Sequence, residues 1–171
     1  MTDPDFRDAF LRHKDVLYRF AYRMTGSGAA AEDVVQDCFL VLWRRPEAYD
    51  PARGALRAFL FGIARNLILK WARGQRTYDP LADESSICQP IDMVGLERAE
   101  IVARAVQALP QLQREAVILA EYEDLTLDEI ARATEAELAA VKSRLHRGRE
   151  NLRRMLAPLL ETKGTLYGTR S

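Results

Sequence analysis

Apolar residues recur at intervals of three and four along most of the chain, the spacing that places them on one face of an α-helix. In the first half of the chain this pattern predicts helices over residues 6–24, 30–45 and 55–73. Gly26 follows the first of these segments and Pro46 follows the second, and both residue types end helices. The alternation of apolar and polar positions that would indicate a strand is not found.

The helical pattern stops at residues 77–96, where two prolines, four acidic residues and three serines and threonines follow one another without a period. Beyond this segment it predicts helices over residues 97–108 and 110–122. We therefore predict an all-α fold of two small helical domains, residues 1–76 and 97–157, joined by a flexible acidic linker over residues 77–96. Residues 158–171, which contain Pro158, are expected to form a frayed C-terminal tail.

Two further helix starts lie between residues 126 and 138. Thr126 is followed three residues later by Glu129, a capping box that begins a short helix ending near Ala133. The next start is either a second capping box of Thr134 and Glu137 or a cap near Glu137 itself, and a long helix through residue 156 follows. A short helix, a tight turn and a longer helix form the helix-turn-helix arrangement.

The predicted long helix has an apolar stripe and a basic stripe. Val141, Leu145 and Leu152 must face a core, and Gly148 lies on the same stripe, where two backbones can approach closely. The basic side and its neighbours comprise Lys142, Ser143, His146, Arg147, Arg149, Arg153 and Arg154. Cations that complement the helix dipole would explain only the last turn. The early residues are therefore predicted to read base edges in a DNA major groove, and the later arginines to contact phosphates.

Charge is segregated along the chain although the totals are equal, 25 basic and 25 acidic residues. Residues 51–78 carry six basic and no acidic side chains, whereas residues 101–137 carry three basic and eight acidic ones. Residues 138–171 are again basic, with eight basic and two acidic side chains. Two basic segments therefore flank an acidic middle, and each could bind a polyanion or form a solvated helix face.

The first basic segment includes the helix predicted over residues 55–73. On one of its faces it carries an aromatic ring, an amide and two cations: Phe59, Asn66, Lys70 and Arg73. Aromatic side chains stack on unpaired bases and cations bind the phosphate backbone, so the face is predicted to bind single-stranded nucleic acid. The alternative for Phe59 is a place in the hydrophobic core.

The helix predicted over residues 30–45 is apolar around nearly its whole circumference, more than a small domain can cover with its own helices. Part of it is therefore expected to contact a protein partner. The alternative is a central helix buried on all sides.

Several classes of protein are not indicated. No run of about 18 apolar residues is present and the N-terminus is acidic, so neither a membrane span nor a signal peptide is predicted, and a cytoplasmic location is expected. Cys38 is expected to pack in a helix and Cys88 to be an exposed linker thiol, with a redox role as the alternative for Cys88. No phosphate loop and no cluster of His, Cys and carboxylates is found, so no catalytic residue, cofactor, metal or small-molecule substrate is predicted.

Three stretches together resemble one known family: AEDVVQDCFLVLW, YDPARGALRAFLFGIARN and LPQLQREAVILAEYEDLTLDEIARATEAELAAVKSRLHRGRENL. In this order they are similar to the two domains of an extracytoplasmic-function (ECF) sigma factor of the sigma-seventy family. The resemblance implies a dissociable subunit of bacterial RNA polymerase that directs the core enzyme to promoters and helps to open them. It also implies contacts with the β′ clamp helices and the β flap of the polymerase, and an anti-sigma factor.

The same resemblance assigns roles to particular residues. The surface that docks on the β′ clamp helices matches Asp33, Gln36, Asp37, Leu40 and Trp43. The YDPARG loop, Asn66 and Lys70 match the element that captures a flipped non-template base of the minus-ten sequence. Lys142, Ser143, His146 and Arg147 match the minus-thirty-five readers, with Arg149 near a phosphate.

The sequence also departs from the family pattern. The family usually has a glycine where Glu135 stands and an alanine where Gly148 stands. The alternative to a sigma factor is a stand-alone helix-turn-helix regulator, which would not require the aromatic and amide face of residues 59–73.

Overall fold

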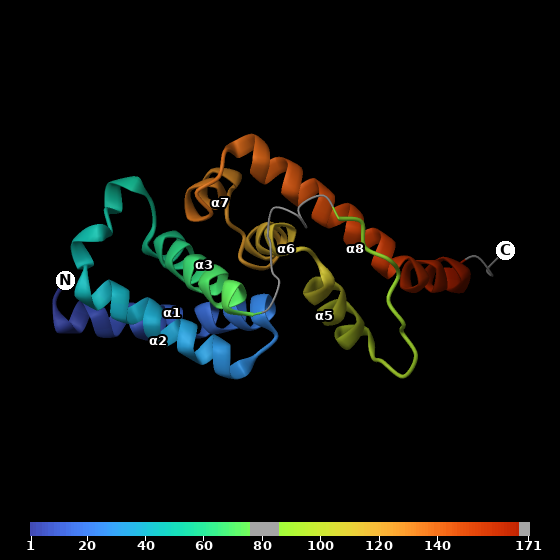
Figure 1. The fold of residues 1–171 in the computed structure, drawn as a ribbon, viewed down its shortest axis with the longest axis horizontal. Helices are drawn as coiled ribbons and strands as arrows, with labels where there is room; N and C mark the ends of the chain where they lie inside the picture. Colours follow the sequence, from blue (N-terminus) through green and yellow to red (C-terminus); the bar gives the residue numbers. More distant parts are fainter. Residues whose placement is uncertain (76–85, 168–171) are drawn as a thin grey trace.

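The computed structural model describes residues 1–75 and 86–167, with side chains to residue 160. Within these residues the elements are helices and turns without a strand, which confirms the all-α prediction. The first helix group consists of α1 (Asp3–Thr25), α2 (Gly28–Arg44) and α3 (Leu56–Gly74), with the short turns η1 (Pro46–Ala48) and η2 (Pro51–Arg53) before α3. The second helix group consists of α5 (Arg98–Ala108), α6 (Gln111–Val117), η3 (Ile118–Tyr122), α7 (Leu127–Ala133) and α8 (Leu138–Tyr167) (Figure 1).

The ends of the first helices follow from capping chemistry. The Thr2 hydroxyl accepts a hydrogen bond from the Asp5 N–H, and the Asp5 carboxylate accepts one from the Thr2 N–H, so α1 begins earlier than predicted. Gly26 ends α1 in the left-handed conformation, with φ 69°, and donates its N–H to the Tyr22 carbonyl. Ser27 then caps α2 by accepting a bond from the Ala30 N–H.

The helix-turn-helix prediction is confirmed by α7 and α8. Thr126 and Glu129 form the expected capping box at the start of α7. Thr134 does not cap α8, because its hydroxyl donates to the Ile130 carbonyl at 2.7 Å. The Glu137 carbonyl instead accepts the Val141 N–H at 3.1 Å, so Glu137 directly precedes α8 and the second of the two alternatives holds.

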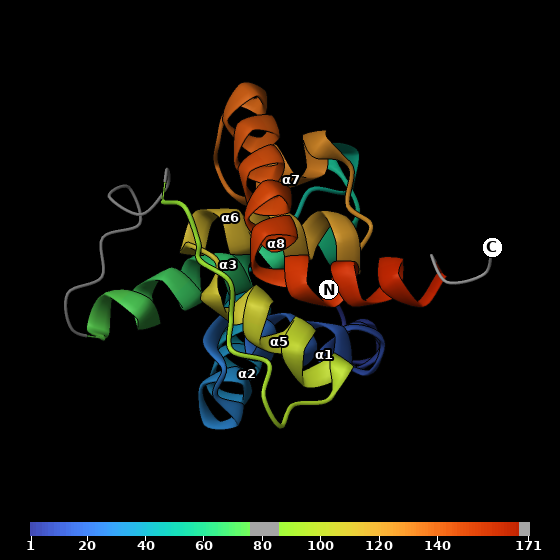
Figure 2. The ribbon, with the colours of Figure 1, turned by 90° about the vertical axis from the view of Figure 1, so that its right-hand side faces the viewer.

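The predicted fraying after Pro158 is wrong, because α8 continues to Tyr167 with Pro158 inside it. Figure 2 shows that the C-terminal part of this helix turns away from the rest. A proline removes one backbone hydrogen bond and clashes with the preceding turn, but the bonds of the residues beyond it remain possible. The proline is therefore accommodated by a bend.

One hydrophobic core joins the two helix groups. From the first group it contains Leu17, Phe20, Phe61, Ala64 and Ile68, and from the second Val106, Ile118, Leu119, Ile130 and Val141. A smaller core lies within the second group and includes Ala105, Leu109, Val117, Leu145 and Met155. Burial of the shared core removes apolar area of both groups from water, and this stabilises their contact.

Part of the predicted linker lies against the second helix group, while residues 77–85 fall outside the described residues. The buried Asn151 side chain accepts the Cys88 N–H at 2.9 Å and donates to the Ser86 carbonyl at 3.0 Å. Cys88 is half-buried against the smaller core, so the expectation of an exposed thiol is wrong. Cys38 is fully buried as expected, and burial raises the pKa of its thiol to about 12.

Candidate nucleic-acid and polymerase interface

The basic face of α8 is open to solvent. Lys142, His146 and Arg147 are exposed, and Ser143 is half-buried beside them. They point outward because Val141 and Leu145 anchor the opposite side of α8 in the two cores. The prediction of a basic helix face beside an apolar one is therefore confirmed for this part of the chain.

Gly148 brings α8 close to α6, as its place on the apolar stripe predicts. A Cβ built on Gly148 would lie 2.6 Å from Cγ2 of Val117 and 3.4 Å from the carbonyl oxygen of Gln113. Real Cβ atoms are not found at the shorter of these distances. The absence of a side chain at Gly148 thus sets how deeply α6 packs against the helix that carries the predicted minus-thirty-five residues.

Arg149, the last of the predicted minus-thirty-five residues, forms an ion pair with a residue outside α8. Its Nε donates to Oε1 of Glu121 at 2.7 Å, and both side chains are about half exposed. An exposed ion pair contributes between about 0 and 1 kcal/mol, so a DNA phosphate could replace the carboxylate at little cost. The structure pairs this arginine with η3.

The predicted minus-ten residues on α3 divide into two pairs. Phe59 and Asn66 line a cavity of about 470 Å³, whereas Lys70 and Arg73 are exposed and do not line it. The Phe59 ring packs against the Tyr49 ring, with the ring centroids 5.4 Å apart. Tyr49 in turn donates its hydroxyl to the Gly54 carbonyl at 3.2 Å, which closes the YDPARG loop beside the cavity.

The opposite wall of this cavity belongs to the second helix group. It is formed by Glu129, Arg132, Ala133 and Glu135 of α7 and its following turn. A Cβ built on Gly62 would lie 3.5 Å from the Cα and carbonyl oxygen of Ala133, so the backbones of α3 and α7 are in direct contact. Arg132 also donates to the Arg53 carbonyl. Phe59 is thus half-buried beside α7, whereas Asn66 remains exposed at the edge of the cavity.

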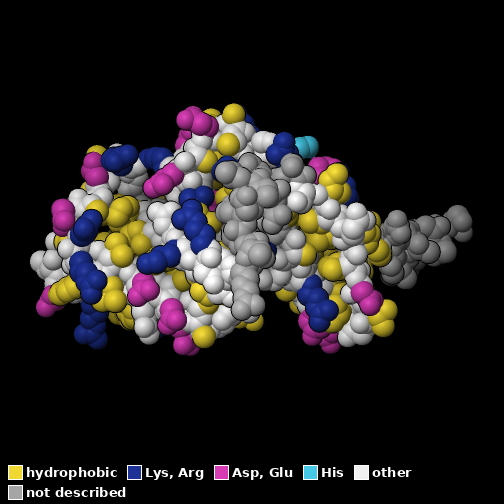
Figure 3. Space-filling model, viewed as in Figure 1, with side chains coloured by type: hydrophobic (Ala, Val, Ile, Leu, Met, Phe, Trp, Pro, Cys, Tyr) yellow, Lys and Arg dark blue, Asp and Glu magenta, His cyan; other side chains and the backbone are white. Residues whose placement is uncertain are grey.

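The predicted polymerase-binding residues share an uncovered face of α2. Asp33, Gln36 and Asp37 are exposed, as are Leu40 (45%) and Trp43 (50%). Trp43 packs edge-on against Phe6, with ring centroids 4.9 Å apart, and a shallow groove runs between Phe6, Phe10 and Trp43. The alternative of a helix buried on all sides is wrong. Figure 3 shows hydrophobic side chains at the surface over the first helix group, next to Lys and Arg side chains.

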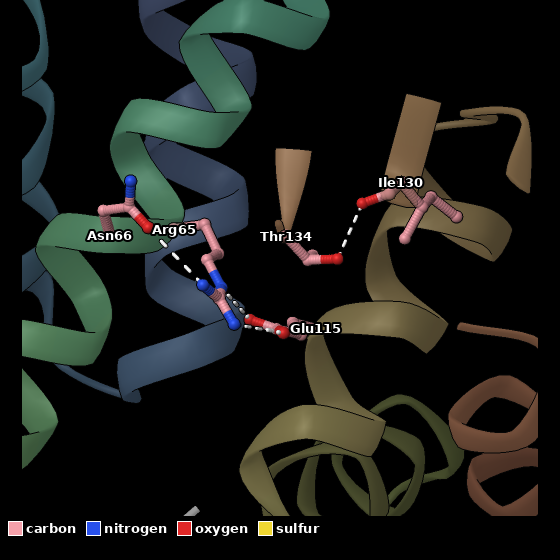
Figure 4. A network of polar contacts seen from close by, with 5 residues as sticks. All are labelled: Arg65, Asn66, Glu115, Ile130 and Thr134. Atoms are coloured by element: carbon pink, nitrogen blue, oxygen red, sulfur yellow. Dashed lines mark hydrogen bonds and ion pairs between the residues drawn. The ribbon is translucent and has the colours of Figure 1, made fainter. Parts of the chain in front are cut away.

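A buried ion pair between the helix groups was not predicted. Arg65 of α3 donates from Nε and Nη2 to the two carboxylate oxygens of Glu115 of α6, at 2.9 and 3.1 Å. The Glu115 side chain is 1% exposed and that of Arg65 is 11% exposed. Burial raises the pKa of the Glu115 carboxyl, and its hydrogen bonds to Arg65 act in the opposite direction. In Figure 4 Arg65 reaches across to Glu115 while Asn66, next to it on α3, contacts the same guanidinium.

A second ion pair joins the groups at the N-terminal end of α3. Arg57 donates to the carboxylate and to the carbonyl oxygen of Glu123, each at 2.8 Å. Arg23 lies 3.7 Å from the same carboxylate. Arg114 completes the contact by donating to the Met24 carbonyl. The sequence feature that could have indicated these contacts is the opposite charge of residues 51–78 and residues 101–137.

The described residues include no group of three or more His, Cys, Asp or Glu side chains that could hold a metal ion. Among the described helices, none has both the length and the apolar character that crossing a membrane requires.

Comparison with known proteins identifies the family to which the two helix groups are similar. The Sigma-70 region 2 model matches residues 9–78, and the Sigma-70 region 4 model matches residues 99–152. A stand-alone helix-turn-helix regulator would account for the second match and not for the first. Regions 2 and 4 thus correspond to the first and second helix groups.

The curated relatives agree with these matches. ECF RNA polymerase sigma factor SigE of Mycolicibacterium smegmatis is 32% identical over 163 residues, which are 90% of this chain and 62% of the relative. SigL of Mycobacterium tuberculosis is 31% identical over 163 residues, 92% of each chain, and SigW of Bacillus subtilis is 28% identical over 169 residues, 90% of each chain. The chain thus spans less than two thirds of SigE and about nine tenths of the other two.

Solved structures with a similar fold include the sigma factor RpoE of Bartonella quintana in complex with the anti-sigma factor NepR. The TM-score is 0.71 at 25% identity, covering 90% of this chain and 97% of that one. CnrH in complex with the cytosolic domain of CnrY has a TM-score of 0.66 at 23% identity, covering 94% and 90%. The chain belongs to the ECF RNA polymerase sigma factors of the sigma-70 family.

Proposed function

We propose that this sigma factor binds core RNA polymerase through α2 and recognises promoters through α3 and α8. The exposed face of α2 docks on the β′ clamp helices. The face of α3 that carries Phe59, Asn66, Lys70 and Arg73 holds the opened non-template strand of the minus-ten element. The basic face of α8 reads the minus-thirty-five element in the duplex. The factor supplies recognition and opening, and the polymerase supplies catalysis.

The observation that supports polymerase binding best is the exposed apolar face of α2. Val34, Cys38 and Leu42 on the inner side of the helix are buried, so the fold already uses one apolar face of α2. Leu40 and Trp43 remain exposed beside an aromatic groove, with acidic side chains and an amide around them. An exposed apolar patch with a polar rim is typical of a protein-binding surface. A regulator that only binds DNA would not need it.

The test is run-off transcription with bacterial core polymerase and a randomised promoter library, with and without the protein. Transcripts that depend on the protein and share an upstream and a start-proximal motif are expected. Sequence-selective duplex binding by the protein alone, without any dependent transcript, would contradict the proposal.

The remaining partners follow from the same role. The solved structure of RpoE in complex with the anti-sigma factor NepR supports an anti-sigma partner for this chain, and region 4 is the proposed contact with the β flap. Because the polymerase and the promoter lie in the bacterial cytoplasm, we propose that location for the protein.

A further inference from the structure

We infer that Glu121 of η3 competes with a DNA phosphate for Arg149 and thereby lowers the affinity of α8 for duplex promoter DNA. The inference rests on the proposed function of α8, in which Arg149 lies near a phosphate. It adds to that function a residue outside the recognition helix that sets the strength of one DNA contact.

The carboxylate of Glu121 occupies one edge of the Arg149 guanidinium. Nε of Arg149 donates to Oε1 of Glu121 at 2.7 Å, and Nη2 donates to the same oxygen. Arginine binds carboxylates and phosphates through paired N–H groups of this kind. A phosphate that approaches this edge must therefore displace Glu121, whose charge has the same sign as its own.

Arg149 differs in this respect from its neighbours on the basic face of α8. Lys142, His146 and Arg147 are exposed, and none of the three forms an ion pair within the part of the chain that the structure describes. Their side chains can contact DNA without first leaving a carboxylate. Arg149 is thus the predicted minus-thirty-five residue whose charge already has a partner.

The segment that carries Glu121 is held in place by the core. Ile118 and Leu119 at the start of η3 are fully buried, and Glu123 at its end is 4% exposed. The Glu123 N–H donates to the Ile118 carbonyl at 3.2 Å, five residues back along the chain. A single π-helical turn of this kind is frequent at functional sites. Because the backbone on both sides of Glu121 is fixed, its carboxylate remains within reach of Arg149.

The pair is nevertheless open to exchange. The side chains of Arg149 and Glu121 are 49% and 47% exposed. Water screens the attraction within a pair of this exposure, which limits its effect on affinity to about fivefold. Glu121 therefore weakens the phosphate contact of Arg149 without preventing it.

The experiment compares four full-length chains, each combined with core polymerase, for their affinity to one promoter duplex selected in the run-off assay. The chains are the unchanged protein, Glu121→Gln, Arg149→Gln and the double variant. We expect Glu121→Gln to raise the affinity about two- to fivefold, because a neutral amide binds the guanidinium less strongly than a carboxylate does. In the Arg149→Gln background the same substitution should change nothing, since the residue through which Glu121 acts is absent.

Two further measurements accompany this comparison. Arg149→Gln alone should lower the affinity and reduce the slope of log affinity against log salt concentration by about 1, as the loss of one phosphate contact does. Glu100→Gln is the matched control, because it removes the same charge from an exposed position in the first turn of α5. Its affinity is expected to equal that of the unchanged chain.

Several results would overturn the inference. Equal affinities of the unchanged chain and Glu121→Gln would show that no competition takes place, and a lower affinity of the variant would make Glu121 a residue that positions Arg149 for the phosphate. An equal gain in the Arg149→Gln background, or from Glu100→Gln, would reduce the effect to net charge.

A failure of the proposed function has a different signature. If Arg149→Gln leaves both the affinity and the salt slope unchanged in a chain that still transcribes, Arg149 does not contact a phosphate and the competition is refuted with it. The absence of any dependent transcript in the run-off assay would contradict the proposed function itself, and the inference that rests on it.

Discussion

Replacing Gly148 by alanine adds one methyl group where α8 touches α6. The new Cβ would lie 2.6 Å from Cγ2 of Val117, whereas carbon atoms in contact keep about 3.5–4.0 Å. Val117 is 1% exposed, and its β-branched side chain has one strongly preferred rotamer in a helix, so it cannot turn away freely. The overlap must therefore be relieved by a shift of α8 relative to α6.

Two effects of known size oppose each other in Gly148→Ala. Alanine is favoured over glycine in a helix interior by about 1 kcal/mol. Overpacking a filled core costs about 1–3 kcal/mol. We therefore expect a net loss of about 1 kcal/mol in the free energy of unfolding. In a Val117→Ala background the clashing atom is absent, and the same substitution should stabilise the chain by about 1 kcal/mol.

The assay is urea unfolding of the full-length chain and of the two single variants and the double variant, followed by circular dichroism. The slope of the free energy with urea should stay constant, so that changes in the midpoint report stability. Gly74→Ala is the control, since an added Cβ there has no neighbour within 4 Å and should not destabilise. If Gly148→Ala has the same effect in both backgrounds, the close contact with Val117 does not limit the packing of α8.

Trp43→Ala should weaken binding of the chain to core polymerase in a pull-down or titration while leaving its duplex DNA binding unchanged; intact polymerase binding would return Trp43 to a packing role. Arg147→Ala should cost about 1–3 kcal/mol in duplex binding and relax the preference at one base pair. Uniform weakening across all sequences would instead make Arg147 a phosphate contact. Asn66→Ala should impair transcription from a duplex promoter more than from a pre-melted one, and an equal loss on both templates would contradict its role in opening. Glu135→Gly should raise the free energy of unfolding by about 0.5–1 kcal/mol, because residue 135 has φ 51°, a left-handed conformation that costs a non-glycine residue about 1–2 kcal/mol. Urea unfolding checks this, and a loss would show that the Glu135 side chain contributes contacts.

Local chemistry explains why most helix boundaries could be predicted. Thr126 with Glu129 and Gly26 act on backbone groups within a few residues of themselves, so their effect can be derived from sequence alone. The role of Thr134 could not be predicted, because its hydroxyl can either accept a backbone N–H of the next helix as a cap or donate to the Ile130 carbonyl of the preceding one. Pro158 was misjudged because a proline can bend a helix as well as end it.

The positive φ of Glu135 connects the family pattern with the structure. The family usually has glycine at this position, and a turn residue in the left-handed region is where glycine is favoured. Glutamate in place of glycine therefore makes the conformational free energy of the turn less favourable. The geometry of the turn is unchanged, since α7 and α8 still form a helix-turn-helix.

Docking of the two helix groups could not be predicted from periodicity, because amphipathic helices do not specify which neighbour covers them. The segregated charges predict polyanion binding, but they are also compatible with ion pairs between the basic and acidic segments of the chain. Arg57 and Arg65 are eight residues apart, as are Glu115 and Glu123, and the structure pairs them in opposite order. The equal spacing would match two parallel segments as well, so the antiparallel direction follows from the observed pairs and not from the sequence. A basic segment of this kind can bind either DNA or an acidic segment of its own chain, and α3 carries both the arginines paired with Glu115 and Glu123 and the residues proposed to bind DNA.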